Sequence, residues 1–92
     1  MDAKVMEGGD RARAMEIFVA AIDRGSFSAA GRAVGLTPSA VSRAVDRIEA
    51  RLGVRLLLRS TRALTPTAEG LAYLQAARRI LADLDRRSCD QQ

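Results

Sequence analysis

The residues of this chain that could do chemistry are mainly arginines and serines between positions 25 and 62. Six arginines lie in the last part of that stretch: Arg43, Arg47, Arg51, Arg55, Arg59 and Arg62. Only Asp46 and Glu49 oppose them there. Guanidinium groups bind phosphates and the edge of guanine, and serine hydroxyls can donate to either. The stretch therefore predicts a surface for a polyanion, with a well-solvated basic surface as the alternative.

Composition favours the same kind of partner and argues against metal chemistry. The 92 residues carry a formal net charge of +4, and the sequence pI is about 10.5. The chain has no histidine and a single cysteine, Cys89, so an internal disulfide, imidazole catalysis and most zinc sites are excluded. We therefore expect neither a metal nor a cofactor.

Catalysis is not expected either. The acidic residues Asp46, Glu49 and Glu69 lack the spacing of a catalytic carboxylate pair, and no base stands beside any serine or cysteine to activate it. No glycine-rich phosphate loop follows a predicted strand. The sequence shows no apolar run of ~20 residues and no signal-peptide segment, so we expect a cytoplasmic protein without a membrane partner.

Two helices are predicted before the basic stretch. Residues 1–9 are polar and end in glycine, so a disordered tail is expected. The first helix should run from a cap at Asp10 to about Arg24, with Gly25 ending it. One of its faces is apolar through Met15, Phe18, Val19 and Ile22. The second helix should cover residues 27–34, between a Ser26 cap and a sharp turn at Gly35.

The third helix carries the side chains that could bind a polyanion. Thr37 should cap it, Pro38 suits its first position, and Gly53 should end it. Its predicted buried stripe comprises Val41, Ala44, Val45, Ile48 and Leu52. On or beside the opposite face lie Ser39, Ser42, Arg43, Asp46 and Arg47.

A hairpin and a long helix are predicted to follow. Strands at 55–58 and 63–65 would place Ser60, Thr61 and Arg62 at the tip between them. Thr67 should cap a helix over about 68–87, leaving residues 88–92 as a flexible tail. Residues spaced as in a coiled-coil seam are Leu74, Ala77, Leu81 and Leu84. They predict dimerisation, although the stripe could instead pack on its own domain.

Together these elements favour DNA as the polyanion. A helix pair with a tight glycine turn, whose second helix has an outer face of serine and arginine, is how small domains place a helix in the major groove. Arg59 and Arg62, near the hairpin tip, could reach phosphates or a narrow minor groove. Ser28 could touch a phosphate or simply help to start its helix.

The chain resembles the N-terminal DNA-binding domain of the LysR-type transcriptional regulators. The resemblance rests on FVAAIDRGSFSAAGRAVGLTPSAVSRAVDRIEARLGVRLLLRSTR, followed by PTAEGLAYLQAARRIL. It covers about residues 14–86. It implies a mainly α fold, in which a winged helix-turn-helix of three helices and a two-stranded wing over 10–66 precedes a linker helix over 67–87.

The resemblance also implies residue roles. The DNA-reading helix would contribute Thr37, Pro38, Ser39, Ser42 and Arg43, and the wing would contribute Arg59, Ser60, Thr61 and Arg62. The linker helix would pack antiparallel on its twin in a homodimer that binds two-fold related half-sites. Many members of the family carry Gln-Pro where this chain has Pro38-Ser39, so the base contact usually made by that Gln is not carried over.

Length is the larger departure from the family pattern. Members usually continue into an effector-binding domain, which this chain lacks, so no small-molecule effector site is expected in it. The chain is either a fragment of a longer regulator or a naturally short relative. Two alternatives remain open: a MarR-like winged-helix repressor, which usually dimerises through helices at both ends, and a protein-interaction module that borrows the fold.

Overall fold

The computed structural model of the chain describes residues 3–59 and 64–90, with side chains described over 11–59 and 64–84. The elements follow the chain in the order α1 (Ala3–Arg24), α2 (Phe27–Val34), α3 (Pro38–Leu52), β1 (Leu57–Arg59), β2 (Leu64–Pro66) and α4 (Ala68–Asp90). This is the mainly α, winged helix-turn-helix architecture that the sequence predicted, with a long helix after the wing.

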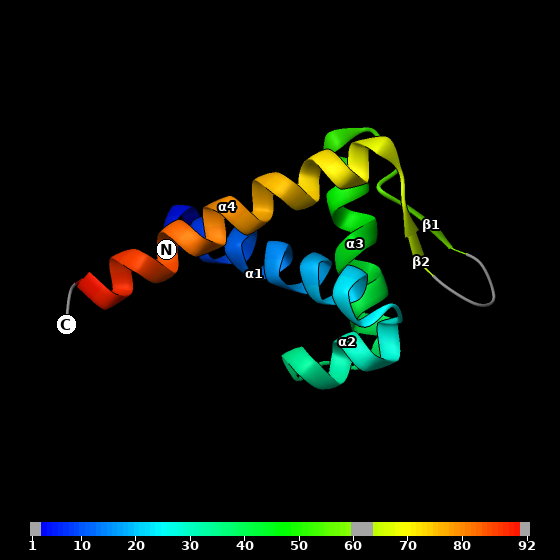
Figure 1. Cartoon of the computed structure of the whole chain (residues 1–92), viewed down its shortest axis with the longest axis horizontal. Coiled ribbons are helices and arrows are strands. Elements are labelled where there is room, and N and C mark those ends of the chain that lie inside the picture. The colour runs from blue at the N-terminus through cyan, green and yellow to red at the C-terminus, as the bar shows by residue number, and fades with distance from the viewer. Residues whose placement is uncertain (1–2, 60–63, 91–92) are drawn as a thin grey trace.

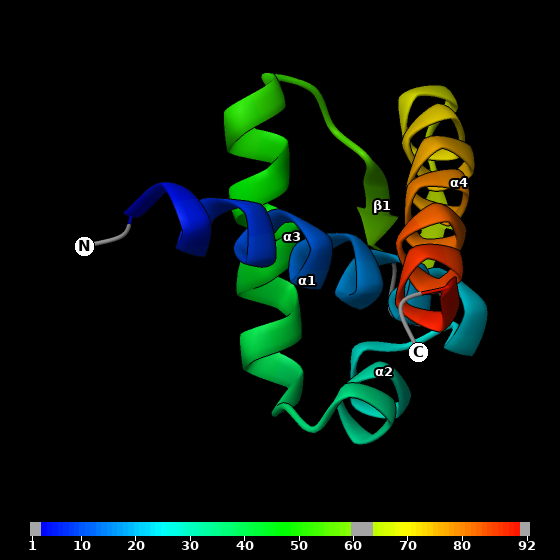
Figure 2. The ribbon, with the colours of Figure 1, turned by 90° about the vertical axis from the view of Figure 1, so that its left-hand side faces the viewer.

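The helices surround α1, which packs against α2, α3 and α4. In two views at right angles, α1 crosses α3, and α2 lies beside the N-terminal end of α3 (Figures 1 and 2). The antiparallel hairpin of β1 and β2 extends from one end of the molecule, and α4 runs back toward the opposite end (Figure 1). The outcome is an elongated body of 43 × 26 × 25 Å.

Local sequence signals set the ends of the central helices as predicted. The side-chain oxygens of Ser26 and Thr37 each accept a hydrogen bond at 3.1 Å from the backbone N–H three residues later, which caps α2 and α3. Gly35 and Gly53, with φ of 77° and 72°, end these helices in the left-handed region where glycine has no steric penalty.

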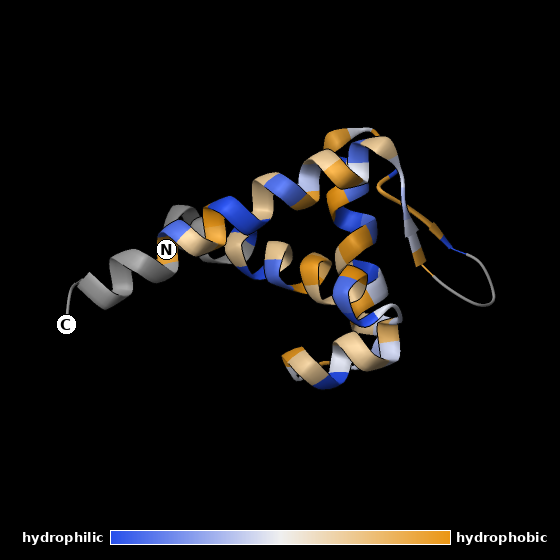
Figure 3. Cartoon of the chain, in the orientation of Figure 1, coloured by the Kyte–Doolittle hydropathy of each residue, from blue (hydrophilic) through white to orange (hydrophobic). Residues whose placement is uncertain are grey.

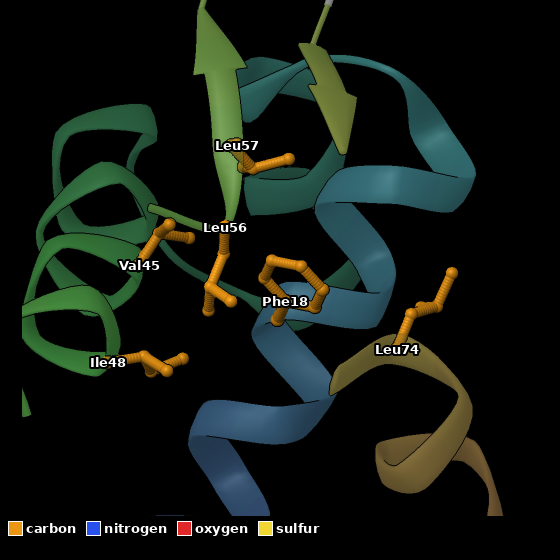
Figure 4. Close-up of a cluster of buried hydrophobic side chains, with 6 residues drawn as sticks. All are labelled: Phe18, Val45, Ile48, Leu56, Leu57 and Leu74. Carbon is orange, nitrogen blue, oxygen red and sulfur yellow. The ribbon is translucent and has the colours of Figure 1, made fainter. Parts of the chain in front are cut away.

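The core lies where α1, α3, the start of β1 and the first turns of α4 meet. Its main cluster comprises Phe18, Val45, Ile48, Leu56, Leu57 and Leu74 (Figure 4). A second cluster toward α2 comprises Ile17, Ala21, Ala30, Val41 and Ala44. Four of the five residues of the predicted α3 stripe are thus buried. Leu52 is the exception, because it lies in the last turn, beyond the reach of α1, and is 48% exposed.

Several predicted boundaries are corrected. Helix α1 begins at Ala3, so the tail expected over 1–9 is helical from its third residue and Asp10 is not its cap. Ala3, Lys4, Met6 and Glu7 are good helix formers, and the two glycines that follow cost about 1 kcal/mol each relative to alanine. Helix α4 likewise continues to Asp90, into the segment expected to be a flexible tail.

The strands are shifted toward the C-terminus of the predicted ranges. The register pairs Leu57 with Pro66 and Arg59 with Leu64. The backbone N–H groups of Leu56 and Leu57 both donate to the carboxylate of Glu49, so the N–H side of the chain here is bound to α3. On the carbonyl side, Arg55 and Leu56 accept from the hydroxyl and the N–H of Thr67, just after β2, so the chain is held from both sides before the strand pairing begins.

Candidate nucleic-acid interface

Helix α3 separates an apolar face from a polar one. The side chains of Val41, Val45 and Ile48 are at most 1% exposed, whereas Ser39, Arg43 and Arg47 are exposed on other sides of the helix and Ser42 is half-buried. The colouring by hydropathy shows apolar and polar residues alternating in short groups along α3, as expected for a helix with one buried face (Figure 3). Among the described residues, Arg43 and Arg47 have no ion-pair partner, which leaves two guanidinium groups available to a ligand.

A close turn holds α2 against the N-terminal end of α3. The Leu36 N–H donates to the Gly31 carbonyl at 2.8 Å, and a Cβ on Gly31 would overlap the Leu36 carbonyl oxygen. Only a glycine at position 31 therefore permits this approach. Arg13 of α1 donates from Nη2 to the Val34 carbonyl at 2.5 Å and so binds the end of α2 to the core helix. Sequence reasoning assigned no role to Arg13.

The first turns of α2 and α3 contribute further predicted residues. Ser28, Thr37 and Pro38 are all exposed. The Thr37 hydroxyl oxygen accepts from Ala40 N–H, so this side chain caps α3, while its O–H remains available to donate to a ligand. Backbone N–H groups at the start of a helix suit an anion.

The hairpin projects from the domain beyond the core (Figure 1). Its two strands are short, and Leu58 is 53% exposed on the side away from the core. The predicted wing-tip residues Ser60, Thr61 and Arg62 lie outside the described residues, so their positions are not assigned.

Arg59, expected to bind DNA, has partners within the domain. Its Nη2 donates to Asp46 Oδ1 at 2.6 Å and lies 3.7 Å from Glu49 Oε1. Its guanidinium carbon is 5.3 Å from the centre of the Phe27 ring. The side chain thus bridges β1 to α3 and α2.

Glu49 is a second residue whose role sequence reasoning missed. Its side chain is 13% exposed, and one carboxylate oxygen accepts from the N–H groups of Leu56 and Leu57 at 2.8 and 3.1 Å. A signal was available, because an acidic residue near the C-terminal end of a helix opposes the helix dipole and needs another reason to be there.

Helix α4 carries apolar residues on two faces, which corrects the predicted dimer seam. Leu74 and Ala77 are 8% and 0% exposed because they pack inside their own domain, so neither is available to a second chain. Leu81 is half-buried, whereas Leu84 is 42% exposed. Ile80 is 43% exposed, and Ala76 precedes it by one helical turn.

Arg78 of α4 forms an ion pair with Asp23 of α1. Its Nη2 lies 2.5 Å from Asp23 Oδ1, and both side chains are about half exposed. The Asp23 partner raises the pKa of Arg78, first through the hydrogen bond and then through charge. The pair joins α4 to α1.

None of the helices in the described part of the chain is long and apolar enough to cross a membrane.

Sequence comparison relates the chain to known regulators. Residues 12–71 match the family model described as bacterial regulatory helix-turn-helix protein, lysR family. The HTH-type transcriptional regulator CrgA of Neisseria meningitidis is 46% identical over 70 residues, which are 76% of this chain and 23% of that protein. An HTH-type transcriptional repressor of Pseudomonas aeruginosa is 45% identical over 76 residues, 83% of this chain and 24% of the relative. The chain thus spans about a quarter of the length of these relatives.

Structural comparison agrees. The fold is similar to that of the DNA-binding domain in the crystal structure of the CbnR_DBD-DNA complex, with a TM-score of 0.79, 39% identity, and coverage of 87% of this chain and 91% of the other. The chain belongs to the LysR family of bacterial regulatory helix-turn-helix proteins.

Proposed function

We propose that this chain is a sequence-specific DNA-binding domain of a transcriptional regulator, which inserts α3 into the major groove and lays the hairpin on the minor groove or the backbone. The observation that carries the proposal is the outer face of α3. Arg43 and Arg47 are exposed there without an ion pair among the described residues, while the opposite face is fixed in the core. A rigid helix with free donors suits direct readout of base edges.

The residues of α3 have different expected tasks. Arg43 lies nearer the N-terminal end, the part of such a helix that reaches base edges, and we assign it to a guanine or to the phosphate beside it. Ser39 and Ser42 supply shorter donors on either side. Arg47 lies one turn further along, where a phosphate contact is the simpler assignment.

The remaining predicted residues surround this helix. Ser28, Thr37 and Pro38 belong to the first turns of α2 and α3, and would approach the sugar-phosphate backbone. At the hairpin, Arg62 would supply a charge to a phosphate or a narrow minor groove, with Ser60 and Thr61 beside it. Arg59 already has partners on α3 and α2, which suits it to positioning the hairpin.

We further propose that two copies associate through α4. The side chains of Ile80 and Leu84 are exposed, and with Ala76 they recur every four residues along one line of the helix. This line keeps Leu84 of the predicted seam and has Ala76 and Ile80 in place of its buried members Leu74 and Ala77. Two linked domains read two half-sites, and the linkage raises the effective affinity without new contacts.

Selection from a random duplex library by the purified chain tests the proposal. We expect enrichment of a site with two-fold related half-sites, and a Kd that rises steeply with salt because each phosphate contact releases counterions. A chain that enriches no sequence, or whose binding does not respond to salt, would support the protein-interaction alternative.

A further inference from the structure

Arg59 connects three elements of the domain at one point. It is the last residue of β1, and its guanidinium group meets Asp46 of α3 and the ring of Phe27 at the start of α2. The side chain is 30% exposed, less than the 54% of Asp46. Arg59 therefore lies in the corner between the hairpin and the helix pair.

The charge of Arg59 is already balanced in that corner. Asp46 Oδ1 is 2.6 Å away and Glu49 Oε1 is 3.7 Å away, so two carboxylates face one guanidinium group. A phosphate that approached the same nitrogen would meet both carboxylates and would have to displace Asp46. This arrangement disfavours a DNA phosphate as an additional partner of Arg59.

The same corner fixes the direction of the hairpin. Glu49 holds the backbone N–H groups of Leu56 and Leu57 just before the strand, and Arg59 holds its far end through Asp46 and Phe27. Burial of Leu57 holds the start of β1 in the core, and the Arg59 contact adds a second attachment to α3 at the far end of the strand, which restricts the angle of the hairpin.

We propose that Arg59 is a positioning residue, which locks the hairpin to α3 through Asp46 and so presents the wing tip to DNA, and that it is not a phosphate ligand. This inference rests on the proposed DNA-binding function. Asp46 is an acidic residue beside the DNA-reading face. By holding Arg59, it would favour DNA binding despite its negative charge.

At a salt concentration that screens the general effect of removing an acidic charge near DNA, the two possible roles of Arg59 predict opposite effects of Asp46→Asn. If Arg59 positions the hairpin, loss of its carboxylate partner weakens binding to the selected site, by up to about fivefold for an exposed ion pair. If Arg59 binds phosphate, Asp46→Asn removes a competing anion and tightens binding.

Salt dependence gives a second criterion. Arg59→Ala should weaken binding by a similar factor. The slope of log Kd against log salt should not change, because no phosphate contact, and so no release of counterions, is lost. Arg62→Ala is the matched control at the wing, where a phosphate contact predicts a slope smaller by about one unit. Arg59→Gln, which is shorter than Arg but keeps an amide donor and part of the alkyl chain, is the second variant if the alanine variant unfolds.

Hydrogen exchange in the free protein separates this inference from the proposed function. In the Arg59 and Asp46 variants, we expect the amides of residues 57–65 to exchange faster than in the parent, while those of α1 stay protected. This measurement needs no DNA, so it reports on the anchor even if the chain bound no duplex.

Weaker binding by Asp46→Asn, an unchanged salt slope in Arg59→Ala and faster hairpin exchange would support the positioning role. Tighter binding by Asp46→Asn, a slope reduced by about one unit in Arg59→Ala, or hairpin exchange equal to that of the parent would overturn it.

Discussion

The Leu56 N–H donates a hydrogen bond at 2.8 Å to the carboxylate of Glu49, which lies one turn before the end of α3. The neighbouring Leu57 N–H donates to the same oxygen at 3.1 Å. One side chain thus satisfies two backbone donors where the chain leaves the helix for the hairpin. Leu56 and Leu57 are both buried, so this bond fixes the strand and the core together.

We expect Glu49→Ala to lower the free energy of unfolding by about 1–3 kcal/mol, because two partly buried N–H groups lose their acceptor. Glu49→Gln keeps an oxygen at the same place and should cost less. Urea unfolding followed by circular dichroism measures both variants. A Glu49→Ala variant as stable as the parent would contradict a structural role for the carboxylate.

Gly70, in the first turn of α4, lies close to the backbone of Leu56 and to Pro66. A Cβ at position 70 would overlap the Leu56 carbonyl oxygen and would lie 3.3 Å from the Pro66 Cβ. Helix propensity alone predicts that Gly70→Ala stabilises the protein by about 1 kcal/mol. We expect the opposite sign, a loss of about 1–3 kcal/mol, because the backbone carbonyl cannot move away cheaply.

The midpoint of urea unfolding decides between these signs. Gln75→Ala, at an exposed position on the same helix, is the control and should stay within about 0.5 kcal/mol of the parent. A Gly70→Ala variant more stable than the parent would show that α4 can move away from Leu56.

Ionisation of the Tyr73 phenol should lower the free energy of unfolding of the domain at alkaline pH. Burial raises the pKa of the Tyr73 phenol above its ordinary value of 10.0, and the charge of Arg51 lowers it by a smaller amount. The ring packs edge-to-face on Phe18 with centroids 5.1 Å apart. The unfolded chain therefore loses this proton first, so the contribution to stability is complete below pH ~10 and is lost as the pH rises through the folded pKa.

Tyr73 is the sole tyrosine of the chain, so the ultraviolet absorbance of its phenolate reports this titration directly. We expect the midpoint in the folded protein to lie above that in urea. Tyr73→Phe should remove this part of the decline in stability between pH 9 and 11, a range chosen around the value of about 10 for a free phenol. Equal midpoints in the folded and unfolded chain would contradict the prediction.

The proposed dimer surface on α4 predicts that Ile80→Asp combined with Leu84→Asp gives a folded monomer. Two charges would enter an apolar contact, where unpaired charges are strongly unfavourable. Leu71→Asp is the matched control, since Leu71 is also exposed on α4 but lies nine residues from Ile80, half a helical rotation away. Sedimentation velocity distinguishes the species, and a double variant that stays dimeric would place the contact elsewhere.

Local signals in the sequence predicted most of the fold. Ser26, Thr37 and Gly53 mark helix ends through chemistry that acts within a few residues, and the period of the apolar residues identified the buried face of α3. Tertiary partners could not be read in the same way. The roles of Arg13, Glu49 and Arg59 depend on groups 21, 7 and 13 residues away along the chain.

Two residues of the predicted α4 seam, Leu74 and Ala77, were assigned to the dimer contact for a related reason. Leu74 and Ala77 share the spacing of a coiled coil, but spacing does not say whether α1 or a second chain covers the stripe. The structure shows that α1 and the core cover this part, which moves the available surface by less than a quarter of a rotation to the line of Ile80 and Leu84.

The most direct test of the central claim, that α3 reads DNA sequence through its outer face, is a comparison of Arg43→Ala with the parent on the selected duplex and on a scrambled one at the same salt. Arg79→Ala, an exposed arginine of α4, controls for the loss of one charge. We predict that Arg43→Ala loses about 1–3 kcal/mol on the selected site and less on the scrambled one, while Arg79→Ala leaves the ratio of the two affinities unchanged. A folded Arg43→Ala variant that binds the selected site as tightly as the parent would contradict the account.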